Sequence, residues 1–120
     1  MNVFKFGGAS VKDAQGVKNV ATVLEQTGHT NLVIVVSAMG KMTNALEGVV
    51  TCYFKEPAKV KQAIEDIKAY HWSVSKEIFT DSNAPVFKQI QILITTLSSF
   101  LQTNKSINQA YVYDLSLIHI

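Results

Sequence analysis

The sequence contains 120 residues, 48% of them hydrophobic, which is enough for about one modest domain. Eleven basic residues, all lysine, against nine acidic ones give a net charge of +2, which is too small to favour nucleic acid or a membrane surface as a partner. The single cysteine cannot form an internal disulfide, which fits a reducing cytosol. The sequence has no signal-peptide pattern and no apolar run of the ~18 residues that a membrane helix needs. These observations predict a cytoplasmic protein.

The first third of the chain is predicted to form a strand, a helix and a second strand. Residues 2–6 form a short apolar strand that stops at two glycines. Apolar residues fall at helical spacing from Asp13, and Gly28 is expected to end that helix. Residues 32–36, Leu-Val-Ile-Val-Val, are typical of a strand covered on both faces in a parallel α/β sheet.

Three amphipathic helices are expected next. Thr43 can cap the first, Pro57 suits the first turn of the second, and the turn residues 81–85 precede the third. The predicted apolar stripes are Leu46, Val49, Val50, Tyr53 and Phe54; Val60, Ile64, Ile67, His71, Val74 and Ile78; and Val86, Ile90, Leu93, Leu97 and Leu101. Residues 110–113 look like the beginning of another strand.

This order of elements predicts a layered α/β fold with too few strands for its helices, so we expect part of a larger sheet. The last six residues, Leu-Ser-Leu-Ile-His-Ile, resemble a translated transposon end used as a sequencing adaptor. We therefore expect residues 1–114 to be native and residues 115–120 to be a non-native tail. The alternative is a genuine apolar C-terminal strand.

The first strand end has the residues of an anion site. Lys5 lies near the carboxyl end of its strand, where α/β sheets hold ligands. Gly7 and Gly8 let backbone amides approach an anion, and Ser10 adds a hydroxyl donor. The second strand ends in the small-residue turn 37–40, so the two ends could share one crevice. A lysine there could stabilise a transferring phosphoryl group, although a snorkelling lysine before a glycine turn is the alternative.

Two segments, VFKFGGASV (3–11) and VIVVSAMGKMTN (33–44), together closely resemble the N-terminus of aspartate kinases in the amino acid kinase family. The resemblance extends over residues 1–114. It implies an α/β/α sandwich with a mainly parallel central sheet, of which only the N-terminal part is present. It also implies ATP-dependent phosphorylation of the L-aspartate side-chain carboxylate to 4-phospho-L-aspartate, the first step toward lysine, threonine and methionine.

The resemblance assigns roles to particular residues. Lys5 would be catalytic and would bind the ATP phosphates together with Phe6, Gly7, Gly8 and Ser10. The aspartate would be bound by Ser37, Ala38 and Thr43. Position 9 is more often threonine in the family, so Ala9 removes a hydroxyl group. Mg²⁺ would arrive with ATP, and the full-length protein would be a homo-oligomer. The chain alone is expected to be inactive, because the family's arginine, acidic residues and base pocket are not found in it.

Other interpretations stay open at this point. The chain could belong to another carboxylate kinase of the same fold, to a bifunctional aspartate kinase–homoserine dehydrogenase, or to a small non-catalytic nucleotide-binding module. Ser37 could bond its own turn and Thr43 could act only as a helix cap. We expect His71 to pack in the core, Cys52 to be inert, and the lysines at 55, 59, 61 and 68 to form a solvated helix face.

Overall fold

The computed structural model describes residues 1–103, which fall into two compact units. The first unit, Met1–Met42, contains the strands, and the second, which begins at Thr43, is helical. Among the described residues, no helix combines the length and the apolar character needed to cross a membrane.

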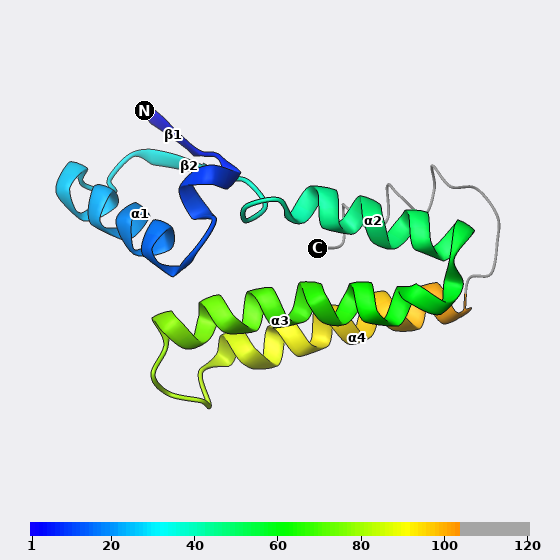
Figure 1. The fold of residues 1–120 in the computed structure, drawn as a ribbon. Helices are drawn as coiled ribbons and strands as arrows, with labels where there is room; N and C mark the ends of the chain where they lie inside the picture. The colour runs from blue at the N-terminus through cyan, green and yellow to red at the C-terminus, as the bar shows by residue number, and fades with distance from the viewer. Residues whose placement is uncertain (104–120) are drawn as a thin grey trace. The chain divides into compact units, whose positions relative to one another are not determined.

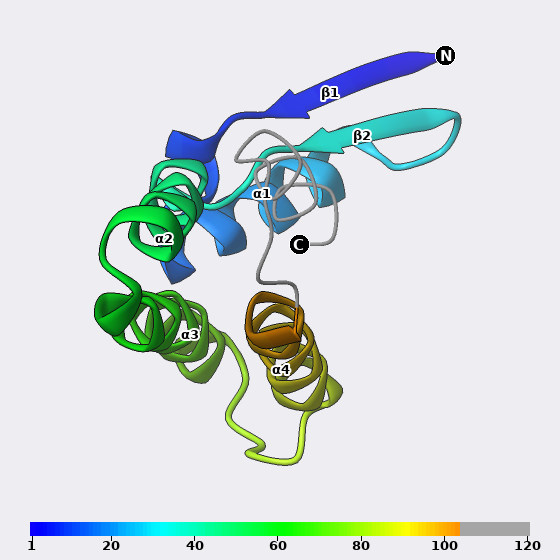
Figure 2. The same ribbon diagram turned by 90° about the vertical axis from the view of Figure 1, so that its right-hand side faces the viewer.

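The first unit is built around two parallel strands, as the sequence predicts. Strand β1 (Asn2–Phe6) and strand β2 (Leu32–Val36) pair in parallel from Asn2↔Leu32 to Phe6↔Val36. Figure 2 shows the two strands side by side, with both arrowheads pointing in the same direction. A parallel pair needs a crossover connection, which consists here of the short 3₁₀ helix η1 (Gly8–Val11) and helix α1 (Ala14–Thr27).

Helix α1 has the ends that its sequence predicts. Asp13 is the N-cap, and its Oδ1 accepts a hydrogen bond from the Gly16 amide at 2.8 Å. Gly28 ends the helix with a φ of 78°, a value that glycine adopts at little cost. Val11 and Ala14 are buried where η1 meets α1.

The prediction that β2 is covered on both faces is not met in this chain. Val33, Ile34, Val35 and Val36 are between 42% and 56% exposed. Strand β1 is uncovered on one face, where Val3 is 64% exposed, whereas Phe4 and Phe6 are half-buried on the other with their rings edge to face at 6.5 Å. The edges are open as well, since β1 and β2 have only each other as strand partners among the described residues.

The second unit contains helix α2 (Met42–Lys55), the short helix η2 (Pro57–Lys59), and the long helices α3 (Val60–Ile78) and α4 (Pro85–Thr103). Figure 1 shows α3 and α4 lying side by side as an antiparallel pair. The buried apolar side chains of this unit are Leu46, Val49, Val50, Ile64, Ile67, Val74, Phe87, Ile94, Leu97 and Leu101.

Two helix predictions are wrong in detail. Thr43 is not the N-cap of α2, because the helix already begins at Met42, whose amide bonds the Met39 carbonyl at 3.0 Å. The buried face of α4 includes Phe87 and Ile94, whereas Leu93 of the predicted stripe is 41% exposed. This helix carries apolar residues at adjacent positions, so two neighbouring stripes match helical spacing and the sequence does not choose between them.

The other helical predictions are confirmed. Pro57 opens η2, which leads directly into α3. Residues 81–84 form the turn before α4, in which the Asn83 amide donates to Asp81 Oδ1 at 2.9 Å and the Ala84 amide donates to the Asp81 carbonyl at 3.1 Å. The predicted strand at 110–113 and the tail at 115–120 lie outside the described residues.

Candidate functional site

The carboxyl ends of β1 and β2 are joined by backbone hydrogen bonds that continue beyond the strands. The Ser37 amide donates to the Phe6 carbonyl at 3.0 Å, and the Gly40 amide donates to the Gly8 carbonyl at 3.0 Å. The loop 5–10 and the turn 37–40, which are about 30 positions apart in the sequence, therefore lie against each other. The two strand ends are adjacent, as the sequence predicts, and the shared crevice stays a prediction.

Lys5 is exposed and stands opposite Val35 in the strand register. Strand alternation puts its side chain on the face away from Phe4 and Phe6. Its ammonium forms no hydrogen bond or ion pair within the described residues, so it is available to an anionic ligand. Its position in an apolar strand therefore does not bury the Lys5 ammonium.

The two glycines after Phe6 have different environments. A methyl group placed on Gly7 would have no heavy atom within 4 Å in the described chain, and its φ of −73° suits any residue. A methyl group on Gly8 would lie 2.7 Å from the Gly40 carbonyl oxygen and 3.0 Å from that of Ala38. Gly7 thus faces open space, whereas Gly8 is required by the chain's own packing.

The predicted hydroxyl donors are accessible. Ser10 and Ser37 are exposed, and neither Oγ forms a hydrogen bond with any residue that the structure describes. Ser37 therefore does not bond its own turn, which was the alternative to a ligand-binding role. Ala38 is also exposed. Phe6 is half-buried, and its carbonyl accepts a hydrogen bond from the Ser37 amide. Thr43 belongs to the helical unit and is exposed in the first turn of α2.

The titratable groups suggest no second chemical centre. Within residues 1–103 there is no group of three or more His, Cys, Asp or Glu side chains that could hold a metal ion. The pKa of Lys59 is raised above its ordinary value of 10.5, chiefly by its hydrogen bond to Glu56 and also by the charge of that carboxylate. The two side chains lie 3.0 Å apart and are 66% and 55% exposed, so they form a surface ion pair.

His71 is less buried than the core position that the sequence predicts. It is half-buried on α3, with Nδ1 2.8 Å from the Ile67 carbonyl oxygen. Cys52 is a half-buried free thiol. Lys68 departs from the predicted solvated face, because it is half-buried and its ammonium lies 5.7 Å from the centre of the Trp72 ring.

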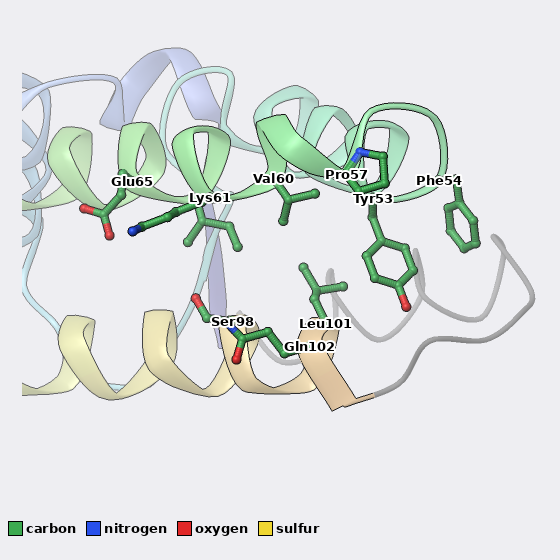
Figure 3. Close-up of a pocket in the computed structure, with 10 residues that line it drawn as sticks. Tyr53, Phe54, Pro57, Val60, Lys61, Glu65, Ser98, Leu101 and Gln102 are labelled. Atoms are coloured by element: carbon green, nitrogen blue, oxygen red, sulfur yellow. The ribbon is translucent and has the colours of Figure 1, made fainter.

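A cavity of about 720 Å³ lies in the helical unit, between the α2–α3 connection and the end of α4. Figure 3 shows Val60 of α3 opposite Leu101 of α4, with Tyr53 and Pro57 near one end. Its polar lining residues are Lys61, Glu65, Ser98 and Gln102. None of the predicted site residues lines this cavity.

The model of the amino acid kinase family matches residues 1–115. The chain belongs to the amino acid kinase family. Two relatives from Arabidopsis thaliana are similar in sequence. Aspartokinase 1, chloroplastic, is 33% identical over 109 residues, and aspartokinase 2, chloroplastic, is 38% identical over 80 residues. These matches cover 88% and 63% of this chain but only 18% and 14% of the relatives, so the chain spans less than a fifth of either protein.

The fold is similar to that of solved aspartokinase structures. E. coli aspartokinase III in complex with aspartate and ADP matches with a TM-score of 0.81 over 99% of this chain, at 20% sequence identity. The same enzyme in complex with lysine and aspartate matches with a TM-score of 0.79. Both matches cover 26% of the solved chain. The predicted α/β class is confirmed, and this chain forms a short piece of the fold with two parallel strands.

Proposed function

We propose that this chain provides the phosphate-binding loop and part of the amino-acid-binding side of an aspartate kinase. The reaction is ATP-dependent phosphorylation of the L-aspartate side-chain carboxylate to 4-phospho-L-aspartate. The observation that carries the proposal is the hydrogen bonding between the two strand ends, which brings the loop of Lys5 and Gly7 against the turn that begins at Ser37. Lys5 and Ser37 are exposed, and a side chain on Gly7 would meet no heavy atom within 4 Å in the described chain. The similarity to aspartokinases, one of them solved with aspartate and ADP, supports the same conclusion.

The chemistry needs little from the protein beyond position and charge. An aspartate carboxylate has an ordinary pKa near ~3.9 and is ionised at neutral pH, so it needs no general base. One of its oxygens attacks the γ-phosphorus, the bond from phosphorus to the bridging oxygen breaks, and the electron pair stays on ADP. The two reactants are both anions, so a cation at the transferring group lowers the barrier.

The individual residues have separable parts in this proposal. The Lys5 ammonium stabilises the charge on the γ-phosphoryl group, while Phe6, Gly7, Gly8 and Ser10 form the loop that surrounds the ATP phosphates. Mg²⁺ would enter with the nucleotide and would neutralise part of the charge on its phosphates.

On the acceptor side of the proposed site, Ser37, Ala38 and Thr43 contact the aspartate. A role in lysine, threonine and methionine synthesis, a cytoplasmic location and a homo-oligomeric full-length protein belong to the same proposal and rest on the resemblance. The two Arabidopsis relatives are described as chloroplastic, so the location needs its own measurement.

The deciding experiment is an acceptor panel with the full-length protein that contains this chain. ADP release is followed with L-aspartate, L-glutamate, N-acetyl-L-glutamate and L-asparagine, and the acyl phosphate is trapped with hydroxylamine. We expect turnover and a trapped hydroxamate with aspartate. We expect neither with asparagine, whose side chain carries an amide in place of the nucleophilic carboxylate. Preference for another acid would indicate a different carboxylate kinase, and nucleotide binding without turnover would indicate a binding module.

A further inference from the structure

The strongest unassigned feature of the strand-end site is the contact between Gly8 and the turn of the second strand. The Gly8 carbonyl accepts the Gly40 amide at 3.0 Å, and no space is left for a side chain on Gly8. The neighbouring Gly7, one position earlier in the same loop, has open space where its side chain would be. Two adjacent glycines in one loop thus meet opposite steric conditions.

The reason for glycine at position 8 lies inside the protein. A methyl group there would lie 2.7 Å from the Gly40 carbonyl oxygen, and ordinary contact begins at 3.4 Å. Both opposing atoms are backbone carbonyl oxygens, of Gly40 and Ala38, which cannot rotate away as the end of a flexible side chain can. The turn itself must move, by about 0.7 Å along that line, to accept the methyl group.

We propose that Gly8 is a positioning residue that holds the turn from Ser37 to Gly40 at the right distance from the Lys5 loop. The inference rests on the proposed function, because it assumes that the turn contacts the amino-acid substrate and the loop contacts ATP. It gives Gly8 a part in aspartate binding in addition to its place in the loop around the ATP phosphates. Substitution of Gly8 weakens aspartate binding, whereas substitution of Gly7 weakens only nucleotide binding.

The size of the effect follows from the displacement. Misplacement of a substrate-holding group by ~1 Å can cost up to ~10²-fold in rate. A shift of about 0.7 Å at the turn therefore predicts a rise of about tenfold or more in the aspartate KM of Gly8→Ala. Gly7→Ala is the matched control, since it adds the same methyl group to the same loop without an internal clash.

The test uses steady-state kinetics of the full-length protein in both substrates. Gly8→Ala is expected to raise the aspartate KM about tenfold or more, and Gly7→Ala to leave it within about twofold while raising the ATP KM. The inference is overturned if Gly8→Ala raises only the ATP KM, or if both variants change the aspartate KM equally. If Gly8→Ala does not fold, Gly40→Ala disturbs the same contact through its φ of 54° and carries the same expectation.

A second measurement separates this inference from the proposed function. The Gly40 amide donates a hydrogen bond to the Gly8 carbonyl. Without any substrate present, hydrogen exchange of this amide is expected to accelerate in Gly8→Ala and to stay unchanged in Gly7→Ala. Unchanged exchange in Gly8→Ala would refute the positioning role even if the enzyme phosphorylates aspartate. Absence of aspartate turnover in the unsubstituted protein would instead refute the proposed function.

Discussion

Removal of the Lys5 charge tests the chemistry most directly. Lys5 is exposed, and Lys5→Ala deletes no hydrogen bond or ion pair of this side chain within residues 1–103. A surface substitution of this kind changes the free energy of unfolding by no more than ~0.5 kcal/mol. Any large loss of activity would therefore come from the interaction with the ligand and not from instability.

The expected magnitude comes from the charge that is lost. A unit charge ~4 Å from a phosphoryl oxygen contributes ~4 kcal/mol at an effective dielectric constant of ~20. Loss of one electrostatic donor to a developing anion typically lowers kcat by ~10²–10³-fold. We therefore expect Lys5→Ala to lower kcat by about 10²-fold or more, with smaller changes in the two KM values.

The assay is coupled ADP release by the full-length protein, with ATP and aspartate each varied. Lys5→Met keeps the aliphatic stem without the charge and should behave like Lys5→Ala. Lys18→Ala removes an exposed lysine from α1 and should leave kcat within about twofold. A kcat near that of the unsubstituted protein for Lys5→Ala would refute the catalytic assignment.

Three further outcomes follow from the structure. Ser37→Ala and Thr43→Val in the full-length protein should raise the aspartate KM more than the ATP KM, and equal effects on both would argue against acceptor binding. The raised pKa of Lys59 means that the stability from its pair with Glu56 is present below pH 10.5 and is lost as the pH rises through the folded-state pKa. NMR titration should show this pKa falling in Glu56→Gln, and an unchanged value would rule out the pair as its cause. The isolated chain should show helical circular dichroism without a sharp thermal transition, because four side chains of β2 are 42% to 56% exposed. It should show no aspartate-dependent ATP turnover, because the family's arginine, acidic residues and base pocket are not found in it. Cooperative unfolding of a soluble monomer would contradict this.

Local pattern accounts for what the sequence predicted correctly. Both strands, the Asp13 to Gly28 helix and the turn at 81–84 follow from short-range chemistry, and the structure has them at those residues. The buried face of α4 was misjudged because Phe87 and Ile94 sit next to equally apolar positions. Only packing against α3 decides between them.

The sequence predicts that the two strand ends lie together, but not which contacts join them. A lysine and two glycines after a strand indicate an anion site without distinguishing the two glycines. The difference between Gly7 and Gly8 depends on the carbonyl of Gly40, which is 32 positions away in the sequence. No local periodicity reports such a contact, so only the three-dimensional structure could reveal it.

The exposed β2 strand has a consequence for synthesis on the ribosome. Translation adds ~5–20 residues per second, whereas contacts between neighbouring helices form in well under a millisecond. Helices α3 and α4 can therefore pair almost as soon as they emerge, while β2, already made, still displays its branched side chains to solvent. For seconds of each round of translation the nascent chain exposes the apolar side chains of β2 while its helical hairpin has already formed. A chaperone that binds exposed apolar segments would cover these side chains during that interval.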